Sequence, residues 1–161
     1  MSVIFGENSK EKLIEGVNLI ADAVKTTFGP NGKNVFIRGA SGLLVTKDGA
    51  TVARYVSDED PAIDMGVELV RNIAIKTADD VGDGTTTSTV LAQQIVNVLK
   101  DSDEHPIEIS RKLQEDVKLV NDLIATHKKE ITTKKDLIKV ATIATNNDPK
   151  LGELIGETYH N

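Results

Sequence analysis

The amino-acid sequence predicts a mainly helical fold with one β-hairpin. Apolar residues recur at helical spacing over most of the chain, and Gly, Pro and Asn interrupt the pattern where helices should end. Residues 34–46 instead contain two short β-like apolar runs joined by a glycine-containing link. With 161 residues the chain can bury a hydrophobic core, and its length suggests about one domain of ordinary size.

The first predicted helix begins at Lys10, where Ser9 can act as its N-terminal cap. Its apolar face consists of Leu13, Ile14, Val17, Ile20, Ala21 and Val24. Gly29-Pro30 is expected to stop this helix, because neither residue continues a helical pattern easily.

The predicted hairpin pairs residues 34–38 with residues 43–46 through a link at residues 39–42. A two-stranded ribbon alone is only marginally stable in water. We therefore expect this hairpin to need a partner, either another part of a longer chain or another subunit.

Several helices are predicted after the hairpin. They are a short helix at residues 50–56, a long one from Pro61 to just before Val81, one at residues 85–99, and one that begins at Pro106. The residues expected to face inward are Met65, Leu69, Val70, Ile73 and Ala74, then Val90, Leu91, Ile95, Val98 and Leu99, and finally Leu113, Val117, Val120 and Ile124.

The polar segment at residues 131–135 breaks the helical period, and we place a domain boundary there. Residues 1–132 would form one domain, and residues 133–161 would begin a second. A short helix at residues 137–142 and a last helix from about Lys150 are expected in the second part.

Composition excludes several classes of function. The chain has no cysteine, so disulfide scaffolds, thiol nucleophiles and Cys-ligated metal sites are excluded. Its formal charge of -6 and its 3% of aromatic residues argue against a nucleic-acid partner. No secretory signal and no apolar run long enough to cross a membrane is found in the sequence. A cytoplasmic protein without nucleic-acid or membrane partners is the expectation.

The strongest local motif is Val-Gly-Asp-Gly-Thr-Thr-Thr at residues 81–87. Glycines permit a sharp turn and close approach of a ligand to the backbone, and a helix start offers free N–H groups to phosphate. Asp83 is a candidate Mg²⁺ ligand, since Mg²⁺ takes one or two carboxylates together with phosphate oxygens. The alternative is an ordinary tight turn in which a threonine caps the helix.

Two further loops add the remaining components of a Mg-nucleotide site. Residues 27–32, Thr-Phe-Gly-Pro-Asn-Gly, end the first helix, and Lys47-Asp48-Gly49 supplies a cation and a second carboxylate. Each loop alone is explained as well by a helix stop or a hairpin exit turn. The sequence contains neither a P-loop nor a G-x-G-x-x-G motif.

These loops, in this order, resemble those of the group I chaperonins, the bacterial GroEL type. The similarity begins near Phe5-Gly6, runs through residues 16–30, 46–54 and 65–66, is strongest at residues 82–92 and persists weakly at residues 143–155. It covers nearly the whole chain and implies a multihelical fold like a chaperonin equatorial domain, with residues 133–161 starting the intermediate domain. The implied activity is ATP hydrolysis coupled to assisted protein folding in a ring.

The resemblance also implies roles for individual residues. Asp83 would bind Mg²⁺, Asp48 would act in catalysis by orienting the attacking water, and a K⁺ ion would lie near Thr27, Lys47 and Thr86. The residues implied to contact the nucleotide are Thr27, Phe28, Gly29, Pro30, Lys47, Gly49, Asp83, Gly84, Thr85, Thr86 and Thr87. The hairpin would pair with a neighbouring subunit of a homo-oligomeric ring, unfolded proteins would be the clients, and a co-chaperonin is left open.

The resemblance is to the N-terminal portion of much longer chains. The part of those chains that returns to the equatorial domain brings a second catalytic carboxylate and the residues that hold adenine and ribose. Catalysis by this stretch alone is therefore expected to be incomplete. Two alternatives remain at this point: a short, non-hydrolysing chaperonin-like interaction module, and an unrelated small Mg-nucleotide phosphotransferase.

Overall fold

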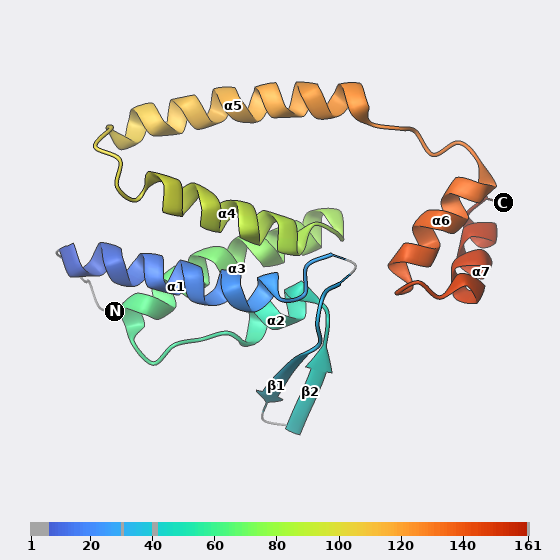
Figure 1. Cartoon of the computed structure of the whole chain (residues 1–161), viewed down its shortest axis with the longest axis horizontal. Helices are drawn as coiled ribbons and strands as arrows, with labels where there is room; N and C mark the ends of the chain where they lie inside the picture. Colours follow the sequence, from blue (N-terminus) through green and yellow to red (C-terminus); the bar gives the residue numbers. More distant parts are fainter. Residues whose placement is uncertain (1–6, 30, 40–41, 161) are drawn as a thin grey trace. The chain divides into compact units, whose positions relative to one another are not determined.

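The computed structural model describes residues 7–29, 31–39 and 42–160, and this part of the chain is mainly helical with one β-hairpin, as predicted (Figure 1). It divides into two compact units, one ending at Asp103 and one beginning at Glu104. The first unit contains α1 (Glu7–Lys25), β1 (Val35–Gly39), β2 (Gly42–Thr46), α2 (Gly49–Tyr55), α3 (Pro61–Val81) and α4 (Thr85–Leu99). The second contains α5 (Pro106–His127), α6 (Lys134–Ala144) and α7 (Pro149–His160).

The core of the first unit lies among α1, α2 and α3, and α4 packs against both α1 and α3 (Figure 1). The apolar face predicted for α1 forms much of this core, since Val17, Ile20 and Val24 are buried. Ser9 lies inside α1, which already includes Glu7, so the cap predicted at Ser9 is wrong.

Helices α1 and α3 cross with their backbones in direct contact. A Cβ atom built on Gly16 would lie 1.9 Å from the carbonyl oxygen of Ile63, and one built on Gly66 would lie 2.1 Å from the carbonyl oxygen of Leu13. Both distances are far below van der Waals contact, so only glycine fits at either position. A 2.6 Å ion pair between Lys12 of α1 and Asp60 also joins the two helices. Asp60 is the N-terminal cap of α3 and accepts the N–H of Ala62.

The inward faces predicted for α3 and α4 are partly wrong. Helix α3 buries Val70 and Ala74 as expected, but α4 buries Thr89 and Gln93. Leu91 is 57% exposed and Val98 75% exposed. Both helices carry apolar residues on two faces, and the described residues cover only one of them. The other predicted inward residues that are exposed are Met65, Leu69, Ile73 and Ile95.

A polar cluster between α1 and α4 explains why Gln93 can be buried. Its Nε2 donates to Asn18 Oδ1 and to Asp22 Oδ1, both at 3.0 Å, while Asn97 Nδ2 donates to Asn18 Oδ1 at 2.8 Å. These bonds offset the cost of removing the amide N–H groups from water, whereas the buried Gln93 Oε1 has no hydrogen-bond partner among the described residues. The Gln93 amide, followed by Lys25, lowers the pKa of Asp22, because both donate to the charged carboxylate.

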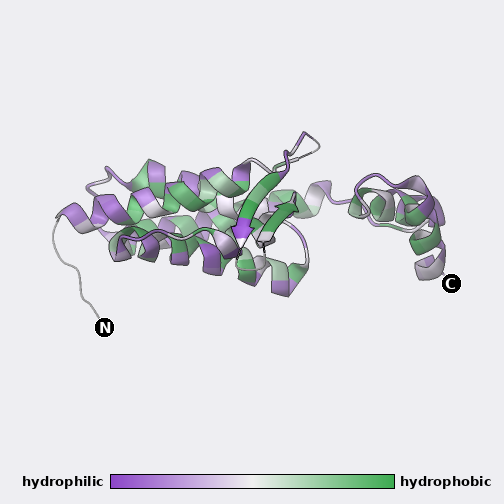
Figure 2. Cartoon of the chain, turned by 90° about the horizontal axis from the view of Figure 1, so that it is seen from below, coloured by the Kyte–Doolittle hydropathy of each residue, from purple (hydrophilic) through white to green (hydrophobic). Residues whose placement is uncertain are grey.

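The hairpin has one side packed against the helices and one side exposed. Val35 and Ile37 of β1 pack against the core, whereas Phe36 is 68% exposed and Leu43 of β2 is 69% exposed. The antiparallel register pairs Phe36 with Val45 and Arg38 with Leu43, so three apolar side chains and Arg38 share the exposed side. Figure 2 shows hydrophobic stretches along both strands. The sheet has two strands in the described residues, and each strand therefore leaves one edge without a neighbour.

In the second unit, α6 and α7 pack closely as a helical pair. A Cβ on Gly152 would lie 2.2 Å from the Thr142 hydroxyl, and one on Gly156 would lie 2.6 Å from the Ile138 side chain. Pro106 begins α5 as predicted, but most of the inner face predicted for α5 is exposed. The domain boundary between residues 132 and 133 stays a prediction. No helix in the described part of the chain is both long and apolar enough to span a membrane.

Candidate functional site

Three loops far apart in the sequence meet around one cavity of about 310 Å³ in the first unit. They are the end of α1, the turn between β2 and α2, and the turn between α3 and α4. The lining residues are Thr27, Phe28, Gly29, Lys47, Asp48, Gly49, Gly82, Asp83, Gly84, Thr85, Thr86 and Thr87. Cavities of this size hold small ligands, and here the lining is rich in hydroxyls, charges and glycine backbone.

The end of α1 contributes residues 27–29. The buried Thr27 hydroxyl donates to the carbonyl of Val24 at 2.7 Å, which fixes its side chain against the last turn of the helix. Gly29 has a φ of 70°, a left-handed conformation that favours glycine at the end of a helix. Phe28 lines the cavity but is half exposed.

The turn before α2 contributes the cation and one carboxylate. Asp48 caps α2: its Oδ2 accepts the N–H of Thr51 at 2.7 Å and the Thr51 hydroxyl at 2.5 Å. Among the described residues, no hydrogen bond engages its other oxygen, Oδ1. Lys47 is exposed, and within residues 7–29, 31–39 and 42–160 no ion pair engages it, so its ammonium group can meet an anionic ligand.

The turn before α4 has the features of an anion site at a helix start. Gly82 and Gly84 have φ values of 77° and 81°, and the Gly84 N–H donates to Asp83 Oδ1 at 2.7 Å. Gly84 is the N-terminal cap residue of α4, with no side-chain cap bond. The alternative in which a threonine caps this helix is therefore wrong, because all three threonines lie inside its first turn. The N–H groups of that turn have no acceptor within the helix.

A contact between hydroxyls joins the first loop to the third. Thr27 Oγ1 and Thr86 Oγ1 lie 3.3 Å apart. A threonine hydroxyl has one proton, and that of Thr27 is already donated to Val24. Thr86 must therefore be the donor in this contact, which leaves its lone pairs for any ligand in the cavity.

The cavity can accommodate a magnesium ion together with an anion. Asp83 uses one oxygen for the Gly84 N–H and keeps its other oxygen for a hard cation. The described residues contain no cluster of three or more His, Cys, Asp or Glu side chains around a common point. The rest of a Mg²⁺ coordination shell would therefore come from phosphate and water, which is the usual arrangement for this ion.

The structure brings together eleven of the twelve predicted site positions, because Pro30 lies outside the described residues. Sequence reasoning missed the contribution of Thr51, which holds Asp48 by two hydrogen bonds. The spacing of three residues between an Asp cap and a hydroxyl residue could have indicated this pairing. It also missed the direct contact between the Thr27 and Thr86 hydroxyls.

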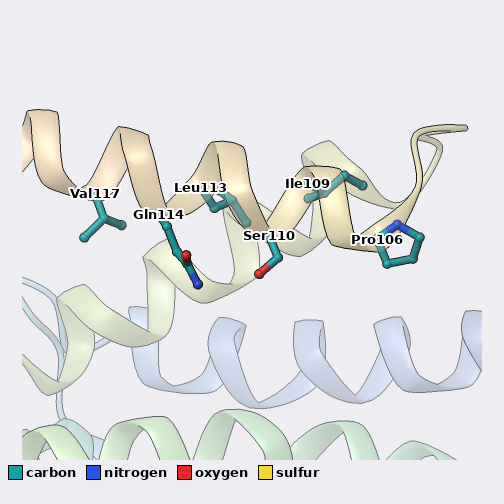
Figure 3. A pocket seen from close by; sticks show the side chains of 6 residues that line it. All are labelled: Pro106, Ile109, Ser110, Leu113, Gln114 and Val117. Carbon is teal, nitrogen blue, oxygen red and sulfur yellow. The ribbon is translucent and has the colours of Figure 1, made fainter.

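Another hollow lies along the first three turns of α5 and has a different character (Figure 3). Its lining residues are Pro106, Ile109, Ser110, Leu113, Gln114 and Val117. None of these side chains titrates or carries a charge, so this hollow offers little for chemistry on a phosphate. The cavity formed by the three loops is the candidate functional site, because its lining combines hydroxyls, charges and glycine backbone with the start of a helix.

Comparison with known proteins identifies the family. The sequence pattern of the TCP-1/cpn60 chaperonin family matches residues 20–160. The chain belongs to this family. The structure of this chain is also similar to solved structures of the chaperonin gp146 from bacteriophage EL 2 (Pseudomonas aeruginosa) in the presence of ATP-BeFx. Two crystal forms match this chain with TM-scores of 0.85 and 0.84, each at 29% sequence identity.

The chaperonin match covers 97% of this chain and 28% of the phage protein. The chain thus spans 28% of the length of the chaperonin that it matches. It corresponds to the N-terminal equatorial portion of a chaperonin, which confirms the predicted resemblance and the predicted fold class.

Proposed function

We propose that this chain supplies the N-terminal part of the Mg-ATP site, and ring contacts, to an ATP-driven chaperonin that assists protein folding. The observation that carries the proposal is the meeting of three distant loops in one cavity. This cavity combines Lys47, Asp48 and Asp83 with threonine hydroxyls and the start of α4. Family membership and the presence of ATP-BeFx with the phage chaperonin give independent support.

In the proposed site, the three loops together bind phosphate, metal and the attacking water. The first-turn N–H groups of α4 and the Lys47 ammonium bind phosphate oxygens. Asp83 holds Mg²⁺, which neutralises phosphate charge when bound. Asp48 orients the attacking water through the carboxylate oxygen that Thr51 does not occupy. Thr27, Phe28 and Gly29, together with Pro30, flank the nucleotide.

A K⁺ ion near Thr27, Lys47 and Thr86 is part of the proposal. The contact between the two hydroxyls supports it, because Thr27 Oγ1 and Thr86 Oγ1 lie 3.3 Å apart at the cavity and provide two neighbouring oxygen ligands. A cytoplasmic location, unfolded clients and a co-chaperonin belong to the same proposal.

Calorimetric titration tests the nucleotide site directly. We expect the full polypeptide that the gene encodes to bind ATP with Mg²⁺ present, more weakly with the metal removed, and to hydrolyse it in single-turnover experiments. Acceleration of client refolding by ATP tests the chaperone role. Binding without hydrolysis would favour the non-hydrolysing interaction module instead, and absence of binding would overturn the proposed site.

The exposed side of the hairpin supports the proposed ring contacts. Phe36, Leu43 and Val45 form an apolar surface next to unpaired strand edges. Exposed edges of this kind pair readily with another strand, and a neighbouring subunit would supply that strand around a closed ring. Pairing would satisfy the free backbone groups, and side chains of the added strand would cover part of the apolar surface.

We expect Phe36→Lys to break subunit assembly without unfolding the helices, because a charge on the exposed side of the hairpin disfavours its burial in a contact. Sedimentation velocity should show a shift from oligomer to smaller species, and amide exchange across residues 35–46 should become faster. Tyr159→Lys, at an even more exposed aromatic position on α7, is the control and should assemble normally. An unchanged oligomer in the Phe36 variant would count against ring contacts through this hairpin.

A further inference from the structure

Gly49 occupies the point where the three loops of the cavity touch. It is buried at the first position of α2, directly after Lys47 and Asp48. A Cβ atom at this position would lie 2.4 Å from Thr86 Oγ1, and it would lie 3.3 Å both from Thr27 Oγ1 and from Val24 Cγ1. The end of α1 and the start of α4 therefore close over the space where a side chain would be.

Glycine is needed at residue 49 because its neighbours leave no space for a side chain. Gly29, Gly82 and Gly84 line the same cavity with positive φ values, and for these the backbone conformation itself favours glycine. Gly49 is not among the glycines with positive φ. Its backbone would suit any residue, and what excludes a side chain is the hydroxyl of Thr86.

We propose that Gly49 is a positioning residue that sets the distance between the loop carrying Lys47 and Asp48 and the first turn of α4. A methyl group at residue 49 needs about 1 Å more room than the Thr86 hydroxyl leaves. Making that room moves α4 away from α2 and strains the contact between Thr86 and Thr27. The expected effect on ATP binding rests on the proposed Mg-ATP site. There, the same movement separates the first-turn N–H groups of α4 from Lys47 and Asp48. Displacements of about 1 Å at a reacting centre can cost on the order of 100-fold in rate.

The test is a set of paired substitutions in the full polypeptide. Gly49→Ala should weaken binding of ATP in the presence of Mg²⁺ about 10-fold or more and lower the midpoint of urea unfolding. Thr86→Ala removes the colliding hydroxyl, so adding Gly49→Ala to it should cause no further loss in either measurement. Thr86→Val keeps the bulk but not the hydroxyl, so Gly49→Ala should still be harmful in that background.

The matched control is Gly39→Ala. A Cβ at Gly39 would meet Tyr55 at 3.6 Å, an ordinary contact, so this variant should bind and unfold like the parent. Equal effects of Gly49→Ala in the Thr86→Ala and Thr86→Val backgrounds would overturn the inference, as would normal behaviour of Gly49→Ala alone. If the parent protein fails to bind ATP, the proposed function falls, and the unfolding midpoints alone still decide whether Gly49 and Thr86 exclude each other.

Discussion

Asp83→Asn is expected to reduce Mg-ATP hydrolysis by the complete protein by about 100-fold or more while the fold stays intact. The amide keeps an oxygen that can accept the Gly84 N–H, as Asp83 Oδ1 does at 2.7 Å, so the turn before α4 should survive. What the substitution removes is the negative charge that Mg²⁺ requires. Steady-state turnover and the Mg²⁺ concentration needed for half-maximal rate are the measurements.

Asp80→Asn provides the control for Asp83. Asp80 lies three residues earlier, is exposed, and does not line the cavity. The Asp80→Asn variant should hydrolyse ATP at the same rate as the parent protein. Normal turnover in the Asp83 variant would contradict the proposed metal ligand, whereas a lowered unfolding midpoint in that variant would indicate a structural role for the carboxylate.

The second large effect is expected at Asp48. Asp48→Asn should slow hydrolysis about 100-fold, and ATP affinity should stay within a few-fold of the parent. Asparagine caps helices as well as aspartate does, so the hydrogen bond from the Thr51 N–H should be kept and α2 should remain folded. The lost charge is the one proposed to orient the attacking water. Single-turnover hydrolysis and calorimetric binding separate these two steps.

Two companion variants separate the catalytic charge of Asp48 from its capping role. Asp48→Ala removes both, so it should slow hydrolysis as Asp48→Asn does and also cost about 1 kcal/mol of stability. Thr51→Ala removes one hydrogen bond to Oδ2 but leaves the carboxylate in place, so hydrolysis should fall far less. A loss of binding as large as the loss of turnover in Asp48→Asn would make this residue a ligand or a structural group.

Local signals in the sequence were sufficient for the order and type of the helices. Proline at residues 61 and 106 and glycine at residues 82 and 84 mark helix starts and stops through backbone geometry, which needs no knowledge of tertiary contacts. Local signals could not predict which face of α3 and which face of α4 point inward. Each helix has two apolar faces, and hydropathy alone cannot choose between them.

The buried polar residues of α4 show why tertiary pairing decides this choice. Gln93 is buried because Asn18 and Asp22 of α1 accept its amide hydrogens, a match across 71 or more residues of chain. Sequence reasoning could group the three loops as parts of one nucleotide site, and the structure gathers them in one cavity. It could not foresee the contact of Thr27 with Thr86, because that depends on how α1 and α4 pack.

The glycine crossing of α1 and α3 restricts how the site can move. Since Gly16 and Gly66 bring the two backbones into contact, neither helix can slide along or rotate against the other without a collision. The C-terminal ends of α1 and α3, which lead into Thr27 and Gly82, are therefore expected to keep a fixed distance from each other. Adjustment of the cavity to a ligand is therefore expected at the starts of α2 and α4 and not in the contact between α1 and α3.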